Sequence, residues 1–174
     1  NAQMWSPVGV VDSSVAAYAR FQYRCHQSQV PYVRSVTEAI RNTDADTFVV
    51  ATTAPSHVAI VEEIISTRAA KFVLVEKPIS TNLGEARQLR AMLNSNNWAG
   101  TVGVDFNRRC SDLYAHAREI IHSGELGVLA RIVYSRQCKI SMKGAHYIDM
   151  ANWIIDSAAT KVTANLDDSP AIDP

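Results

Sequence analysis

Four short runs of β-branched and apolar residues predict buried strands. Each run is continuous and does not alternate between apolar and polar positions. Continuous apolar runs are typical of parallel strands, because a parallel sheet is covered on both faces. The runs cover residues 7–11, 47–51, 72–75 and 101–106.

Segments with helical spacing of apolar residues lie between these runs. Ser35 and Glu38 form a capping box at the start of one helix. Ser56 is placed to cap a second helix, and Thr81 is placed to start a third. Alternation of strands and helices at this pitch predicts an α/β fold with a doubly wound parallel sheet.

The pattern changes after the last run. Ser111 opens a predicted helix that Gly124 is placed to end, and the spacing predicts another helix over residues 146–155. Two further strands are predicted, at about 128–137 and 161–166. We place a domain boundary after residue 107, giving parts 1–107 and 108–174. The second part is thin for an independent core. Three explanations stay open: the second part packs against the first part, the chain continues beyond the sequence shown, or a partner subunit completes the core.

Composition excludes several classes of protein. Apolar residues make up 47% and charged residues 20% of the chain, as in a globular protein. Seventeen Lys and Arg balance seventeen Asp and Glu, whereas a nucleic-acid binder is expected to be basic. No apolar run approaches the ~20 residues that cross a bilayer, so no membrane partner is expected. Widely spaced Cys25, Cys110 and Cys138 favour reduced thiols in a cytoplasmic protein.

Asp12 follows the first predicted strand and is a candidate for chemistry. In a dinucleotide-binding sheet, an acidic residue at the tip of the second strand accepts hydrogen bonds from the ribose hydroxyls. Its charge also disfavours a 2′-phosphate. An Asp after a strand is usually a turn or helix N-cap residue, so the motif alone leaves both interpretations open.

Small hydroxyl residues follow the second predicted strand. Thr52 and Thr53 lie beside a predicted helix N-terminus, which suits contact with a phosphate or a ribose. Simple capping by Ser56 is the alternative. His57 lies in the first helical turn, where an imidazolium is disfavoured, so we interpret it as neutral and structural.

Glu76, Lys77 and Pro78 follow the third predicted strand. A lysine at the carboxyl end of a buried parallel strand points into the crevice where such sheets bind ligands. Partial burial would favour its neutral form and let it exchange protons. The alternative is a surface lysine paired with Glu76, although adjacent strand residues face opposite ways.

His146 and Asp149 are three residues apart on a predicted helix and share a face. Such a pair can be an acid–base unit, half a metal site or a structural contact. Two ligands without a third make the metal interpretation weaker, and no metal site is predicted.

Together these motifs resemble the Gfo/Idh/MocA family, which includes glucose–fructose oxidoreductase and inositol dehydrogenase. The resemblance covers about residues 7–156. Its most specific piece is Glu76-Lys77-Pro78 after a buried strand. The other matching positions are Asp12, Thr52 and Thr53 with His57, Gly124 to Gly127, the segment 144–149, and Trp153.

The resemblance implies two domains. Residues 1–107 would form part of a Rossmann-like domain that binds NAD(H) or NADP(H). Residues 108–174 would begin a C-terminal α/β domain, whose open and mainly antiparallel sheet commonly joins subunits into a homo-oligomer. Substrates in the family are usually sugars, nucleotide sugars or cyclitols.

The resemblance also implies roles for individual residues. Lys77 would contact substrate and cofactor, and His146 would accept or donate the proton, with Asp149 as a third catalytic residue. The peptide between Lys77 and Pro78 is often cis in the family. The remaining implied cofactor contacts are Asp12, Thr52, Thr53, His57, Glu76, Pro78 and Asn107.

Two features depart from the family pattern. No G-x-G-x-x-G motif occurs in the chain, so the first Rossmann strand and helix are expected to be missing from it. Family members also often carry an Asp four residues before the catalytic His, where this chain has Met142.

The sequence therefore predicts an NAD(P)-dependent oxidoreductase that transfers a hydride between the cofactor and a sugar, nucleotide-sugar or cyclitol hydroxyl. Asp12 favours NAD, and NADP is not excluded. Lys77 and His146 are predicted to line one cleft. The alternative is a non-catalytic relative that binds a dinucleotide or sugar as a sensor or interaction module. Met142 and the absent loop favour this alternative, whereas Lys77 and His146 favour the enzyme.

Overall fold

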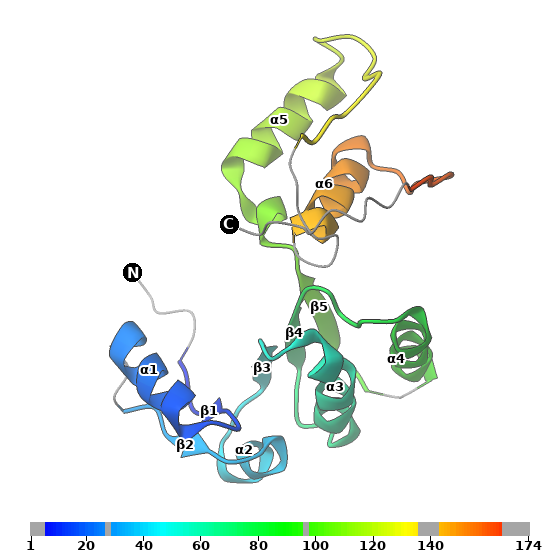
Figure 1. Ribbon diagram of the computed structural model, residues 1–174. Coiled ribbons are helices and arrows are strands. Elements are labelled where there is room, and N and C mark those ends of the chain that lie inside the picture. The colour runs from blue at the N-terminus through cyan, green and yellow to red at the C-terminus, as the bar shows by residue number, and fades with distance from the viewer. Residues whose placement is uncertain (1–5, 27–28, 96–97, 136–142, 165–174) are drawn as a thin grey trace. The chain divides into compact units, whose positions relative to one another are not determined.

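The computed structural model describes residues 6–26, 29–95, 98–135 and 143–164 (Figure 1). The chain divides into two compact units, Asn1–Val104 and Asp105–Pro174. The assignment of domains at residue 107 stays a prediction.

The strands of the first unit form two small sheets. In one sheet β1 (Val10–Val11) pairs in parallel with β2 (Tyr32–Val33). In the other, the order is β3 (Thr47–Val50), β4 (Phe72–Glu76) and β5 (Thr101–Asp105). β3 and β4 are parallel, with Val50 opposite Val75. The predicted parallel α/β architecture is confirmed.

Helices connect the strands of this unit (Figure 1). They are α1 (Val15–Cys25), α2 (Val36–Asn42), the short 3₁₀ helix η1 (Ala54–Ser56), α3 (His57–Ser66) and α4 (Leu83–Ser95). The sequence analysis did not predict α1 or β2. Helix α1 has no buried residue, and β2 is only two residues long.

One of the predicted helix starts is confirmed. The Ser35 hydroxyl accepts a hydrogen bond from the Glu38 amide at 3.1 Å. The Glu38 carboxylate accepts in turn from the Arg34 amide at 3.0 Å, one residue before the cap. Helix α2 therefore begins with a variant of the capping box, in which the Glu38 side chain binds the amide of Arg34 and not that of the cap residue Ser35.

The predicted start at Ser56 is right in position, because Ser56 directly precedes α3, whereas the predicted start at Thr81 is wrong by one residue. Ser56 has helical backbone angles and its side chain makes no capping bond. The reason is that η1 runs directly into α3, and the Ser56 hydroxyl donates to the Thr53 carbonyl instead. Helix α4 is capped by Asn82 and not by Thr81. The Asn82 side-chain oxygen accepts from the Glu85 amide at 2.9 Å.

The core of the first unit lies between α3 and the three-stranded sheet. Val61, Ile64 and Ile65 of α3 are fully buried together with Val73 and Val75 of β4. Each such side chain stabilises the fold by about 1.5–3 kcal/mol relative to an exposed one. This packing holds the carboxyl ends of β3 and β4 beside the start of α3.

The second unit contains the 3₁₀ helix η2 (Asn107–Cys110), α5 (Asp112–Ser123) and α6 (Ala145–Ile155). Gly124 ends α5 with a φ of 77°, as predicted. Arg118 of α5 donates to the Trp153 carbonyl of α6 at 2.9 Å, and its guanidinium lies 5.0 Å from the centre of the Trp153 ring.

The strands predicted at 128–137 and 161–166 are absent from their described parts, residues 128–135 and 161–164. A β-branched pattern becomes a strand only where another strand satisfies its backbone groups. Within the described part of this unit no segment pairs with them, and Val128 and Val133 are exposed. The implied antiparallel sheet is therefore not seen there. Residues 136–137 and 165–166 lie outside the described residues.

Candidate functional site

The parallel register of β3 and β4 brings two predicted site segments to one edge of the sheet. Thr52 and Thr53 follow the end of β3, and both are exposed. Glu76 ends β4, and Lys77 and Pro78 follow it, partly buried. The Lys77–Pro78 peptide is cis, as the resemblance implied.

The buried ring of His57 joins these two segments. Only 1% of His57 is exposed. Its Nδ1 lies 2.9 Å from the Pro78 carbonyl oxygen, and its Nε2 lies 3.0 Å from the Thr52 carbonyl oxygen. Both ring nitrogens therefore face backbone acceptors. This geometry favours the structural interpretation of His57, and the implied direct contact with the cofactor stays a prediction.

Asp12 lies directly after β1, at the turn into α1. One carboxylate oxygen accepts a hydrogen bond from the Ser14 amide at 2.7 Å. The Asp12 carbonyl accepts from the Tyr32 hydroxyl at 2.6 Å, which ties this turn to β2. The turn interpretation is thus observed. A carboxylate has a second oxygen and further lone pairs, so the same residue retains capacity to accept from a ribose hydroxyl.

The second unit holds Asp149 in an ion pair with Arg109. The Arg109 Nε donates to Asp149 Oδ2 at 2.8 Å, and Nη2 donates to Oδ1. The Asp149 side chain is only 9% exposed, whereas that of Arg109 is 45% exposed. Hydrogen bonding to Asp149 raises the pKa of Arg109 above its ordinary value. Both carboxylate oxygens of Asp149 are therefore engaged by one guanidinium.

His146 lies one helical turn before Asp149 on α6. Its ring meets the Phe106 ring edge-on, with centroids 6.0 Å apart and an interplanar angle of 85°. The Arg109 guanidinium lies 5.9 Å from the centre of the same Phe106 ring. Asn107 is the first residue of η2 and is exposed.

A second group of side chains surrounds Tyr147, the residue after His146 on α6. The Tyr147 ring stacks on Tyr134 with centroids 4.6 Å apart, and the Arg108 guanidinium lies 4.7 Å from its centre. Burial raises the pKa of the Tyr134 hydroxyl above its ordinary value. The sequence analysis missed Arg108 and Arg109, because nothing in their spacing connects them with residues some forty positions later.

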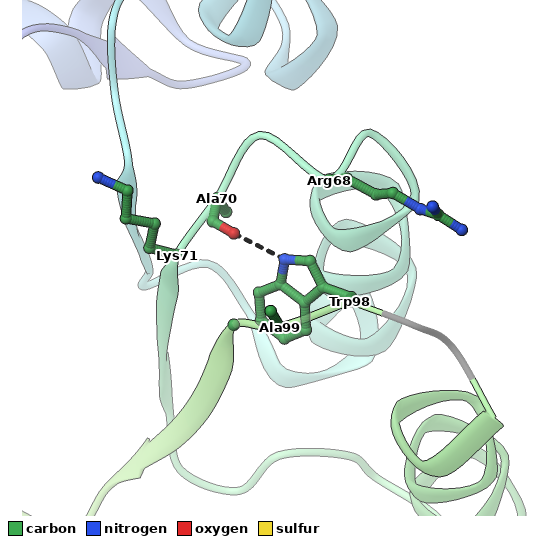
Figure 2. A pocket seen from close by; sticks show the side chains of 6 residues that line it. Arg68, Ala70, Lys71, Trp98 and Ala99 are labelled. Atoms are coloured by element: carbon green, nitrogen blue, oxygen red, sulfur yellow. Dashed lines mark hydrogen bonds between the residues drawn. The ribbon is translucent and has the colours of Figure 1, made fainter.

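A hollow of about 150 Å³ lies at the other end of the sheet (Figure 2). Lys71 precedes β4 and Gly100 precedes β5, so this hollow is at the amino ends of the strands. The Trp98 indole borders it and donates to the Ala70 carbonyl at 2.6 Å. No predicted site residue lines this hollow, whose lining is Arg68, Ala70, Lys71, Trp98, Ala99 and Gly100.

Residues 1–104 match the family described as an oxidoreductase family with an NAD-binding Rossmann fold, Gfo/Idh/MocA. The chain belongs to this family. The predicted family and the predicted Rossmann-like fold are thereby confirmed, and NAD is the cofactor that the family description names.

Two curated relatives in the Gfo/Idh/MocA family bear the name oxidoreductase. The uncharacterized oxidoreductase YhhX of Escherichia coli K12 is 31% identical over 105 residues, 60% of this chain and 29% of the relative. The putative oxidoreductase YceM of Salmonella typhimurium is 38% identical over 90 residues, 52% of this chain and 27% of the relative. The chain spans less than a third of the length of these relatives.

Solved dehydrogenases share the fold. The myo-inositol dehydrogenase of Lactobacillus casei, in complex with NAD(H) and myo-inositol, matches with a TM-score of 0.68 and 23% identity, covering 86% of this chain and 46% of that one. The WlbA dehydrogenase of Bordetella pertussis, in complex with NADH and UDP-GlcNAcA, matches with a TM-score of 0.68 and 16% identity, covering 85% and 47%.

The residues of this Gfo/Idh/MocA chain fit parts of a dinucleotide. The Asp12 carboxylate suits ribose hydroxyls, and the exposed hydroxyls of Thr52 and Thr53 can donate to phosphate or ribose oxygens. Lys77 belongs to the first unit and His146 to the second, and their shared cleft stays a prediction.

Within residues 6–26, 29–95, 98–135 and 143–164, no group of three or more His, Cys, Asp or Glu is placed to hold a metal ion. Over the same ranges, no helix is both long and apolar enough to cross a membrane. The cytoplasmic location and the homo-oligomer stay predictions.

Proposed function

We propose that this chain takes part in the NAD-dependent oxidation of a hydroxyl group on a sugar, nucleotide sugar or cyclitol, or in the reverse reduction. The observation that carries the proposal is the placement of Thr52 and Lys77 at the carboxyl ends of the paired parallel strands of a family Rossmann unit. Ligands of open α/β sheets bind at that end. Neighbours of the same fold bind NAD(H) with a cyclitol or NADH with a nucleotide sugar.

The first unit would hold the cofactor. Asp12 would accept hydrogen bonds from the ribose hydroxyls, and its negative charge would repel a 2′-phosphate. The hydroxyls of Thr52 and Thr53 would donate to cofactor oxygens. Glu76, Pro78 and Asn107 are further proposed contacts. The bound nicotinamide would supply the hydride acceptor or donor.

Lys77 would hold the reacting oxygen of the substrate. An ammonium donates charge-assisted hydrogen bonds, and these strengthen as negative charge develops on that oxygen. The His57 ring holds the carbonyl of Pro78, the neighbour of Lys77. This contact would limit the movement of the lysine backbone.

His146 would move the proton. In oxidation, a ring nitrogen of His146 takes the proton of the substrate hydroxyl while the carbon–hydrogen bond breaks with loss of hydride and a carbonyl forms. In reduction, the imidazolium returns that proton to the oxygen. Such a positioned acid or base contributes roughly 10²–10⁴-fold to the rate.

The test is NADH formation by the purified protein with NAD and a panel of myo-inositol, glucose and UDP-N-acetylglucosamine derivatives. We expect His146→Ala and Lys77→Ala each to lose roughly 10²–10⁴-fold in kcat while NAD affinity stays within about threefold. The matched control is His116→Ala, because His116 is exposed on α5.

Two outcomes would contradict the proposal. Turnover that survives both substitutions would remove Lys77 and His146 from the chemistry. Tight NAD binding with no turnover of any panel member would favour the non-catalytic alternative.

A further inference from the structure

We infer that Arg109 and Asp149 form a positioning pair that orients His146, and that Asp149 itself exchanges no proton with the substrate. The inference rests on the proposed role of His146 as the proton acceptor. It changes the role that the sequence suggested for Asp149, from a catalytic residue to an anchor.

The ion pair of Arg109 and Asp149 has a defined geometry. Arg109 binds Asp149 through Nε and Nη2, one to each carboxylate oxygen. Side-on pairs of this kind fix both direction and distance, because a guanidinium and a carboxylate are planar. The pair therefore joins η2 to the first turns of α6, two elements that contact each other. A carboxylate held in this way, with a side chain 9% exposed, is poorly placed to serve as a base.

The Phe106 ring links the ion pair to the His146 ring. Phe106 immediately precedes η2, and its ring meets His146 edge-on at 6.0 Å. Arg109 lies over the same Phe106 ring at 5.9 Å. One guanidinium thus contacts both Asp149, on the helix that carries His146, and Phe106, the ring against His146. Two aromatic rings prefer an offset or perpendicular arrangement over a face-to-face one. The contact with Phe106 therefore favours one orientation of the His146 ring.

Arg109 also acts on His146 through its charge. A free carboxylate one turn from His146 would stabilise the imidazolium and retain its proton. Arg109 compensates that charge, which keeps the imidazole ready to accept a proton. Other charged residues close to these groups in the sequence are Asp105, which precedes Phe106, Arg108 of η2, and Lys143, three residues before His146.

Removal of the Arg109 charge and removal of the Asp149 charge should have opposite effects on the pH dependence. Arg109→Gln leaves Asp149 uncompensated, so the acid limb of the kcat/KM pH profile should move up by about one pH unit. Asp149→Asn leaves Arg109 uncompensated, so the limb should move down by a similar amount. The double variant should return the limb to within a few tenths of a unit of the parent. A purely structural pair would lower activity at every pH without opposite shifts.

The orientation argument is tested by Arg109→Lys. Lysine keeps the charge but cannot bind both oxygens in a fixed plane. We expect kcat to fall roughly 10- to 100-fold, the cost of misplacing a reacting group, with KM within about threefold and the acid limb unmoved. A lysine variant with the kcat of the parent would overturn the orientation role.

A measurement that needs no turnover separates the inference from the proposed function. The ring-proton resonances of His146 can be followed by NMR during a pH titration of the parent, Arg109→Gln and Asp149→Asn proteins. We expect titration midpoints that move in opposite directions. Arg118→Gln serves as the matched control, because Arg118 of α5 bonds the far end of α6. Unmoved midpoints would overturn the inference even if His146→Ala is inactive. Opposite shifts together with an active His146→Ala protein would retain the pair and reject only the catalytic role of His146.

Discussion

The imidazole of His57 reaches from the start of α3 to Pro78, where its Nδ1 lies 2.9 Å from the carbonyl oxygen. The other ring nitrogen faces the Thr52 carbonyl at 3.0 Å. One buried side chain therefore links the segments that follow β3 and β4. An apolar residue at position 57 would lose these contacts, because no apolar side chain can donate a hydrogen bond to the Pro78 or Thr52 carbonyl.

We predict that His57→Phe, which keeps an aromatic ring but removes the imidazole N–H donor, destabilises the first unit. A buried carbonyl left without a donor costs about 1–3 kcal/mol. The free energy of unfolding from urea denaturation provides the measurement. His116→Phe is the surface control and should change it by no more than about 0.5 kcal/mol. Equal stability of the parent and His57→Phe would show that the ring contacts contribute nothing.

Asp12 should set the preference between NAD and NADP. The parent is predicted to bind NAD more tightly, since a carboxylate at the adenosine ribose repels a 2′-phosphate. Asp12→Asn keeps the side-chain oxygen that accepts from the Ser14 amide and removes the charge. The ratio of the dissociation constant for NADP to that for NAD should therefore fall towards one. Calorimetric titration with both dinucleotides decides the matter. Tighter NADP binding by the parent would refute the assignment.

Gly124 should resist replacement by residues with a Cβ. Its φ of 77° lies in the left-handed region, which costs an L-residue such as Ala about 1–2 kcal/mol. Gly124→Ala should lower the free energy of unfolding by that amount, and Gly124→Asn by less, because Asn tolerates this conformation. The space around the glycine is open, with no atom within 4 Å of an added Cβ. A loss as large for Asn as for Ala would point to a cause other than backbone strain.

The sequence predicted the elements whose own residues determine them. The strands near 47–51 and 72–75 were predictable because their runs are apolar throughout, and α2 because Ser35 and Glu38 act within one helical turn. The start of α4 was misassigned, since Thr81 and Asn82 are both good caps and only the folded backbone selects between them.

The missed contacts depend on tertiary structure. Arg109 and Asp149 are forty residues apart and meet only when η2 packs on α6. His57 reaches Pro78 across twenty-one residues for the same reason. The strand predicted at 128–137 failed in its described part because β propensity alone supplies no hydrogen-bonding partner.

The central claim is hydride transfer between a substrate carbon and NAD, and deuterium labelling tests it most directly. The protein would be incubated with NAD and with cyclitols and nucleotide sugars that carry deuterium on the carbinol carbons, and the NADH formed would be analysed by mass spectrometry. We expect NADH that contains one deuterium per molecule from at least one substrate, and a loss of this product in Lys77→Ala and His146→Ala. NADH that forms without deuterium, or labelled NADH that forms equally well in both variants, would contradict it.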